Sequence, residues 1–323
     1  MPFTVVRFNL VDPRATPASL SERYRAALAM AAYADEHGID TVQTEEHHGA
    51  ANNWLPSPFA FAGAVFGATR RIAVTVSAAI GPLHDPLRLA EEIAVLDLLS
   101  GGRLVTVAGI GYRPEEYEER GVDWGRRGKL QDLLLETLLQ AWSGEPFTYQ
   151  GRTVRITPRP FTQPHPLLLV GGSSKAAARR AARLGLPFFP SAHLPELEAD
   201  YRRLCAEYGT EGWTMMPAEE TPLLHLSEDP DRSWELYGEH FLHEARTYAS
   251  WQSKDIRSAV RSTATTVAEL RAEGVYRIVT PRECLALGLE SLVLHPLCGG
   301  MPVDEAWRSL RLFGEDVLPR LGA

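Results

Sequence analysis

The feature that most constrains the fold of this chain is a regular alternation of β-rich runs with stretches of helical spacing. Residues 72–80 read IAVTVSAAI, a β-branched run without a charge that is typical of a parallel strand buried on both faces. Residues 20–37 carry apolar side chains at helical spacing and are followed by Gly38, a residue type that commonly ends helices. Because parallel strands are joined by crossover connections that usually contain a helix, this alternation predicts a parallel α/β sheet.

Eight β-rich runs are separated in this way, each by a connection long enough for a crossover. They lie at residues 3–10, 39–44, 72–80, 104–110, 167–170, 187–190, 222–226 and 292–295. This count, with no GxGxxG fingerprint after the first run, favours a closed (β/α)8 TIM barrel over an open doubly wound sheet. Residues 275–279 resist assignment, because they lie inside a long and mostly helical stretch.

The whole chain, residues 1–323, fits a single barrel domain, since barrels of about 250 residues or more commonly form one domain. Two segments depart from the repeating pattern. Residues 144–166 are rich in Pro, Thr and Arg and predict an excursion with a short hairpin around residues 149–155. Residues 231–288 predict a mostly helical insertion. We expect such insertions at the carboxyl-terminal face of the barrel, where they shape access to a site.

Composition argues against several classes of function. The chain has 33 basic and 41 acidic residues, a net charge of −8, and no basic stripe of the kind that nucleic-acid binders carry. Its three cysteines lie far apart without a CxxC pair, which excludes a disulfide framework and a zinc ribbon. No window approaches the roughly 18 apolar residues of a membrane helix, and the N-terminus lacks signal-peptide features. We therefore expect a cytoplasmic protein without nucleic-acid or membrane partners.

Three segments stand directly after predicted strands, where the active site of a TIM barrel lies. They are residues 45–48 (Glu-Glu-His-His), residues 109–113 (Gly-Ile-Gly-Tyr-Arg) and residues 171–175 (Gly-Gly-Ser-Ser-Lys). In the third, Gly171 and Gly172 let the backbone approach a ligand closely, while Ser173 and Ser174 precede a helix whose first N–H groups carry partial positive charge. The segment fits a phosphate site, and it equally fits an ordinary serine-capped helix after a glycine turn.

The paired histidines admit three interpretations. They could belong to a metal site, although adjacent residues at a strand end point to opposite sides and HExxH spacing is missing, so we expect no bound metal. An imidazole also suits proton transfer near neutral pH. The third interpretation places one histidine in the core and the other in solvent. Arg127, which opens a later helix, is either a surface charge or a residue that reaches a phosphate.

Together these segments resemble the luciferase-like flavin monooxygenase family, part of the bacterial luciferase and F420 oxidoreductase superfamily. The resemblance runs from residue 3 to about 190 and returns at residues 292–319. The matching pieces are residues 44–48 (TEEHH), 84–103 (HDPLRLAEEIAVLDLLSGGR), 109–117 (GIGYRPEEY) and 169–175 (LVGGSSK).

The resemblance implies a (β/α)8 barrel that binds reduced FMN. It implies a phosphate loop at Gly171, Gly172, Ser173 and Ser174, with assistance from Arg127, and a cofactor site that includes Gly109. It also implies a non-prolyl cis peptide between Ala78 and Ala79, beneath the isoalloxazine ring. His47 matches a family histidine that acts as an acid or base for the flavin C4a adduct or the substrate. Val107 departs from the family pattern, in which many relatives have glycine.

The implied reaction is monooxygenation, in which reduced FMN from a separate flavin reductase and O2 oxidise a small organic substrate. An F420-dependent oxidoreductase that transfers hydride is the alternative, and a flavin-binding barrel without turnover is a second one. A metal-dependent hydrolase barrel is a third. Members of the family are often dimers, so we expect a homodimer. The substrate is not indicated by any motif.

Overall fold

The computed structural model describes residues 1–252 and 256–321 and is organised around a parallel sheet of nine strands. The order in the sheet is β10-β9-β11-β1-β2-β3-β4-β7-β8. The bounds of these strands are β1 Phe3–Phe8, β2 Thr41–Thr44, β3 Ala73–Ile80, β4 Leu104–Gly109, β7 Leu167–Gly171, β8 Phe188–Phe189, β9 Leu223–Leu226, β10 Tyr276–Val279 and β11 Ser291–Leu294. The parallel α/β barrel architecture expected from the alternation is confirmed, with nine strands in place of eight.

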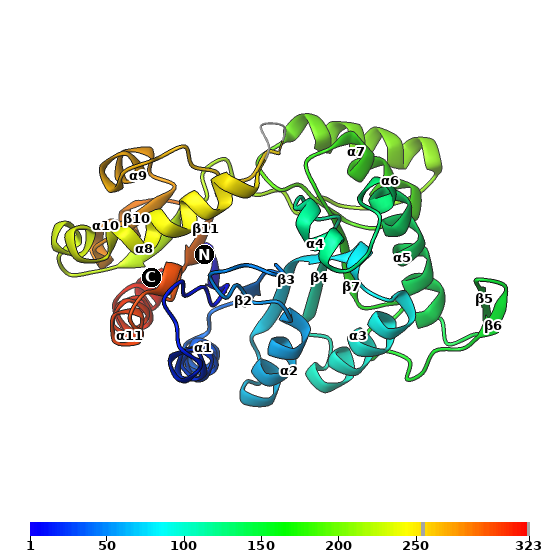
Figure 1. Ribbon diagram of the computed structural model, residues 1–323, viewed down its shortest axis with the longest axis horizontal. Coiled ribbons are helices and arrows are strands. Elements are labelled where there is room, and N and C mark those ends of the chain that lie inside the picture. The colour runs from blue at the N-terminus through cyan, green and yellow to red at the C-terminus, as the bar shows by residue number, and fades with distance from the viewer. Residues whose placement is uncertain (253–255, 322–323) are drawn as a thin grey trace.

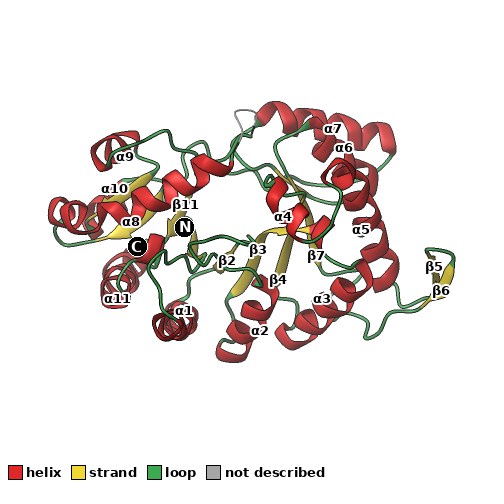
Figure 2. Cartoon of the chain, in the orientation of Figure 1, coloured by secondary structure: helices red, strands yellow, loops and turns green. Residues whose placement is uncertain are grey.

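Helices connect successive strands and surround the sheet (Figures 1 and 2). Their bounds are α1 Pro17–His37, α2 Pro58–Ala68, α3 Pro86–Ser100, α4 Pro114–Glu119, α5 Arg127–Trp142, α6 Lys175–Leu184, α7 Pro195–Tyr208, α8 Pro230–Trp251, α9 Val267–Glu273, α10 Pro281–Ala286 and α11 Val303–Arg311. Among the described residues, no helix combines the length and the apolar character needed to cross a membrane.

The additional strand is β10, which lies within residues 275–279, the segment that the sequence pattern left unassigned. β10 pairs in parallel with β9, and β9 also pairs with β11, so the last three strands do not follow one another in chain order. Four residues between two short helices carry too little periodicity to be recognised as a strand. The rest of the predicted insertion contains the helices α8, α9 and α10, and residues 256–266 between α8 and α9 are irregular. Residues 253–255, which fall inside it, lie outside the described residues.

The predicted excursion contains the predicted hairpin. β5 (Phe147–Tyr149) and β6 (Arg152–Val154) pair antiparallel and project away from the main sheet (Figure 1). The hairpin begins two residues earlier than expected from the sequence, and its turn places Gln150 at a φ of 48° and Gly151 at 76°.

Helix α8 crosses over the sheet, whereas the other long helices lie around it (Figure 1). It therefore brings side chains to the ends of the strands. It packs closely on a turn that follows β11. There Gly299, at a φ of 54°, leaves no room for a side chain, since a Cβ atom would lie 1.9 Å from the carbonyl oxygen of His240. The buried face of α8 includes Glu244 and Tyr248, which are thereby brought to the ends of β1 and β2.

Candidate active site

The carboxyl ends of four neighbouring strands form one continuous rim. Ile80 at the end of β3 pairs with Gly109 of β4, Ala108 pairs with Val170 of β7, and β7 continues the rim to β8. β2 joins it through Glu46, whose carboxylate accepts the N–H of Ile80 at 2.7 Å. The three segments singled out from the sequence therefore follow β2, β4 and β7, which belong to a run of four neighbouring strands that also includes β3.

His47 is held at this rim by both ring nitrogens. Its Nδ1 lies 2.9 Å from Oε1 of Glu116, and its Nε2 lies 3.0 Å from the hydroxyl of Tyr112. The side chain is buried. A carboxylate beside Nδ1 favours the tautomer with the proton on that nitrogen, which leaves Nε2 to accept from the phenol. The imidazole is thus fixed in orientation and in tautomer.

Glu116, on α4, is the residue that fixes it. The same Oε1 accepts the N–H of His48 at 2.9 Å and Nη1 of Arg113 at 3.2 Å, and the side chain is fully buried. Its second oxygen, Oε2, is buried without a hydrogen-bond partner among the described residues. Burial raises the pKa of the Tyr112 hydroxyl well above its usual value, so the phenol remains a proton donor to His47.

Aromatic rings enclose the histidine. Ring centroids of Trp54 and Trp251 lie 5.1 Å and 4.8 Å from that of His47, and Tyr248 packs on Trp54 at 4.9 Å. The guanidinium of Arg113 stacks over Trp251 at 4.1 Å. Trp251 is the last residue of α8, so the crossing helix supplies the roof of the site. Such a lining excludes water and strengthens the hydrogen bonds within it.

His48 faces a separate network, as expected for adjacent residues at a strand end. Its Nε2 lies 2.9 Å from Glu46, and His84 contacts the same carboxylate at 3.0 Å. Burial raises the pKa of Glu46, but hydrogen bonds from His48, His84 and the amide of Ile80 outweigh it and lower that pKa to about 2. Burial lowers the pKa of His84, yet the Glu46 carboxylate more than offsets this and the net pKa is raised.

The remaining carboxylate of the motif, Glu45, joins the sheet to α8. It forms an ion pair with Arg7 of β1 and accepts the hydroxyl of Tyr248 at 2.9 Å. Arg7 also donates to Glu244 of α8 at 2.9 Å. The three residues therefore have different contacts. Glu45 binds Tyr248 of α8, Glu46 binds the last residue of β3, and His47 faces the space lined by Trp54 and Trp251.

The segment after β7 has the geometry of a close backbone approach. A Cβ atom on Gly171 would lie 2.8 Å from Cγ1 of Val107, and one on Gly172, at a φ of 144°, would lie 3.0 Å from Cβ of Ala177. Ser174 caps α6 by accepting the N–H of Ala177 at 3.3 Å. Neither glycine tolerates a side chain, and the N-terminus of α6 opens toward the rim, so this cradle fits the phosphate of a cofactor.

Arg127 begins α5, which lies beside α6 through a contact between Arg180 and Asp132 at 2.8 Å. Its guanidinium stacks on Trp124 at 3.9 Å and donates to the carbonyl of that residue at 2.9 Å. Arg127 therefore lies at the N-terminal end of α5, and its head group is engaged by Trp124.

The expected cis peptide is present one residue earlier than the resemblance implied. It joins Ser77 to Ala78, and the Ala78–Ala79 bond is trans. The pairing of β3 with β4 explains the offset, because Ser77 pairs with Val107 and Ala79 with Ala108, which leaves Ala78 as the unpaired residue of a bulge. Ala78 and Gly109 lie close together there, since a Cβ on Gly109 would be 3.1 Å from that of Ala78.

Sequence reasoning assigned no role to two residues of the site and left two others open between a pocket lining and core packing. Tyr112 and Glu116 lie in a segment whose resemblance was noted, but neither was assigned a role; a carboxylate three residues after Arg113 was the available signal. Tyr248 and Trp251 came from a helical stretch where aromatic spacing is equally typical of core packing. Their positions over His47 depend on how α8 crosses the sheet, which no local pattern encodes.

Comparisons with known proteins identify the family of this chain. The model of the luciferase-like monooxygenase family matches residues 1–278. The protein y4vJ of Sinorhizobium fredii is 28% identical over 190 residues, which are 57% of this chain and 54% of that protein. Rv0953c of Mycobacterium tuberculosis is 32% identical over 177 residues, which are 47% of this chain and 62% of that protein. The matches thus span about half to three fifths of these relatives.

Solved structures match over almost the entire chain. The monooxygenase RslO1 from Streptomyces bottropensis has a TM-score of 0.77 at 28% identity, with 99% of each chain covered. The oxygenating constituent of 3,6-diketocamphane monooxygenase from Pseudomonas putida, in complex with FMN, has a TM-score of 0.71 at 16% identity, again over 99% of each chain. An F420-dependent secondary alcohol dehydrogenase has a TM-score of 0.66 at 15% identity and the same coverage, which shows a shared fold. With the family model covering most of its length, this chain belongs to the luciferase-like monooxygenase family.

Proposed function

We propose that this protein is a monooxygenase that uses reduced FMN and O2 to oxidise a small organic substrate. One observation carries the proposal. His47 is oriented through both ring nitrogens at a rim that continues, over two adjacent strands, into the Gly171–Gly172 cradle. An oriented acid/base group and a phosphate cradle on one rim are what a phosphorylated redox cofactor requires.

The residues after β7 would hold the phosphate end of the cofactor. The backbone N–H groups at the start of α6, with the hydroxyls of Ser173 and Ser174, offer donors to an anion beside the positive end of the helix. Arg127 would add a charge-assisted hydrogen bond once its head group leaves Trp124. Bound flavin supplies the electrons and the reaction with O2. A separate reductase is proposed as the source of reduced flavin, because the sequence carries no dinucleotide fingerprint of its own.

His47 would hold or move a proton at Nε2. Glu116 keeps a proton on Nδ1 and Tyr112 donates to Nε2, so a ligand group that displaces the phenol would exchange a proton with Nε2. Proton transfer of this kind typically contributes about 10²–10⁴-fold to rate. Trp54 and Trp251 would exclude water from the reacting centre. The indole of Trp251 lies against His47 in this structure, so a planar ligand beside the histidine requires that indole to move.

F420 is the alternative cofactor, and one structural neighbour uses it. Titration of the cofactor-free protein with FMN, reduced FMN and F420 distinguishes the two. We expect reduced FMN to bind and to be reoxidised faster by O2 in the presence of substrate. Tight binding of F420 alone would overturn the choice of FMN, and binding of neither would contradict the proposal as a whole.

We also propose a homodimer, and helix α2 supports it. This helix reads PFAFAGAVFGA and has no charged or polar face. Its exposed side is made of small residues such as Ala60 and Ala64, and it lies beside exposed leucines of α3, of which Leu99 is 67% exposed. A contiguous apolar surface of this kind is typical of an interface between copies. Sedimentation of Ala64→Arg against the native protein tests it, and an unchanged dimer, or a native monomer, would contradict it.

A further inference from the structure

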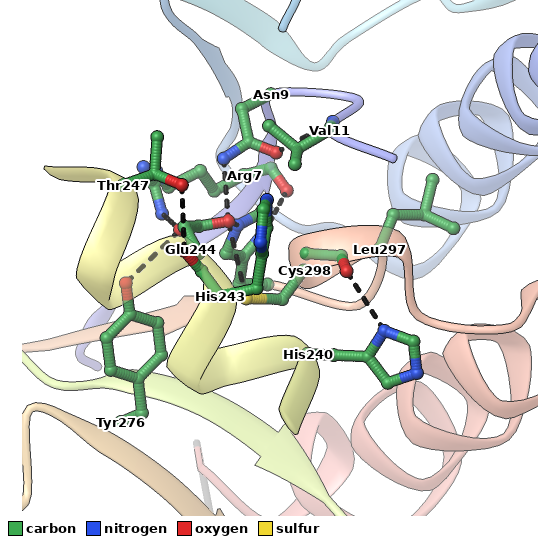
Figure 3. Close-up of polar contacts among 12 residues, drawn as sticks. Arg7, Asn9, Val11, His240, His243, Glu244, Thr247, Tyr276, Leu297 and Cys298 are labelled. Carbon is green, nitrogen blue, oxygen red and sulfur yellow. Dashed lines mark hydrogen bonds and ion pairs between the residues drawn. The ribbon is translucent and has the colours of Figure 1, made fainter. Parts of the chain in front are cut away.

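Beneath α8 lies a buried cluster that the proposed reaction does not use. Glu244 of α8 meets His295 and Cys298, which follow β11, and one ligand atom from each lies within 4.8 Å of the others. Oε2 of Glu244 is 2.8 Å from Nε2 of His295 and 3.3 Å from Sγ of Cys298. All three side chains are fully buried. Figure 3 shows Glu244 directed from the helix toward the loop that carries Cys298.

The backbone holds these side chains in place. Gly299, next to Cys298, adopts a φ of 54° and packs against the carbonyl of His240 on α8, where a Cβ atom would not fit. Nδ1 of His240 in turn lies 2.9 Å from the carbonyl oxygen of Gly299. The loop and the helix are therefore fixed against each other one turn from Glu244.

Contacts around the cluster orient each ligand atom. Nδ1 of His295 lies 3.0 Å from the carbonyl oxygen of Arg7, so its proton points there and Nε2 is left facing Glu244. Oε1 of Glu244 accepts from Nη1 of Arg7 at 2.9 Å and from the hydroxyl of Tyr276 at 3.3 Å, which directs Oε2 toward His295 and Cys298. Oε2 also accepts from Nδ2 of Asn9 at 2.8 Å, a further outer partner of this oxygen. Metal-ligating histidines and carboxylates are oriented by the same kinds of outer partner.

The local charges leave one negative charge to be compensated. Arg7 is the single guanidinium shared by the buried carboxylates of Glu45 and Glu244. A second proton on the imidazole of His295 would supply the missing positive charge. A divalent cation would supply the same net charge, because it adds two positive charges and displaces the thiol proton of Cys298 to solvent.

We propose that Glu244, His295 and Cys298 bind one divalent transition-metal ion, with zinc as the preferred ion, at a structural site distinct from that of His47. The ligand atoms would be Oε2 of Glu244, Nε2 of His295 and Sγ of Cys298, a mixed oxygen, nitrogen and sulfur set that zinc accepts. The ion would tie α8 to the loop after β11 and, through Arg7 and Glu45, stabilise the roof of the active site. No sequence motif indicates this site, because the ligands come from separate segments without motif spacing.

The test is the metal content of the full-length protein. It is produced in medium supplemented with Zn²⁺ or with Co²⁺, exposed to a chelator while folded, and analysed for metal per chain. We expect about one ion per chain and, with Co²⁺, an absorption band from thiolate coordination. Cys298→Ser and His295→Gln should lower retained metal by about tenfold or more.

Matched controls separate the site from general effects on the core. Cys284→Ser changes another buried cysteine, and His225→Gln breaks a buried pair with Glu305 (3.3 Å) that has no thiol beside it. Both should retain metal at the native level. Metal below about one tenth per chain in the native protein, or equal retention in Cys298→Ser, would overturn the proposal. If the variants fail to fold, the cobalt spectrum of the native protein decides alone, and a spectrum without thiolate absorption overturns the site.

Discussion

The two ends of the candidate active site are built in different ways. Around His47 the site consists of side chains from distant segments, with Tyr112 on the loop after β4, Glu116 on α4 and Trp251 on α8. At the other end, the cradle after β7 is formed by backbone atoms. Gly171 and Gly172 carry no side chain there, and the surrounding atoms leave no room for a Cβ. Proton transfer requires oriented side chains, which surround His47. Anion binding requires accessible backbone amides, which the cradle after β7 offers.

Substitution of His47 should have the largest effect, and the effect should be on turnover rather than on FMN affinity. His47→Gln removes the group that moves a proton while keeping hydrogen-bonding capacity, and we expect turnover to fall by about 10²–10⁴-fold with little change in FMN affinity. Stopped-flow reoxidation of reduced flavin with and without substrate measures both. Exposed His193, changed to Gln, is the control. Native turnover in a folded His47→Gln protein would end the assignment.

Glu116→Gln should produce a smaller loss of the same kind. The amide no longer fixes the tautomer of His47, so we expect kcat to fall by about 10–100-fold with KM unchanged and with an altered pH–rate profile. A purely structural role would instead leave the pH profile of the remaining activity as it is. Glu116→Asp, which keeps the carboxylate, should recover part of the loss.

Substitution in the cradle after β7 should lower the affinity for FMN rather than the turnover. Gly171→Ala directs a methyl group at Val107 and displaces the cradle, and we expect FMN affinity to fall by about tenfold, the value of one charge-assisted hydrogen bond. Riboflavin, which lacks the phosphate, should bind the native and variant proteins alike. Gly67→Ala is the control, because a Cβ there meets no atom within 4 Å. An equal loss for riboflavin would place the phosphate elsewhere.

The smallest expected effect concerns stability at the network beside His47. The pKa of His84 is raised above 6.5, so its interaction with Glu46 stabilises the fold fully below pH 6.5 and is lost as pH rises through the higher folded value. The pKa of Glu46 is lowered from 4.5 to about 2, so its contribution is present above 4.5 and lost on acidification toward about 2.

Stability from this pair is therefore greatest between about pH 4.5 and 6.5. His84→Gln should lower the free energy of unfolding by about 1 kcal/mol at pH 5.5 and by less at pH 8.5, as measured by urea denaturation. The same deficit at both pH values would show that the pairing of charges does not matter there.

The same contrast explains what the sequence could predict. The cradle could be recognised because glycine, serine and a helix start stand next to one another along the chain, and the charge-free strand at residues 72–80 identified the fold class. The strand β10 and the bulge at Ala78 could not, because four residues give little periodicity and a bulge depends on the pairing partner. The roof of the site was likewise missed, since the crossing of α8 depends on distant contacts such as that between Glu244 and Arg7.

The most direct test of the central claim is a crystal structure of the protein with FMN bound. We expect the phosphate within hydrogen-bonding distance of Ser173 or Ser174 at the start of α6, the flavin ring beside Ala78 and His47, and Trp251 moved from its present contact with His47. FMN bound away from this rim, or a phosphate that does not contact the residues after β7, would contradict it.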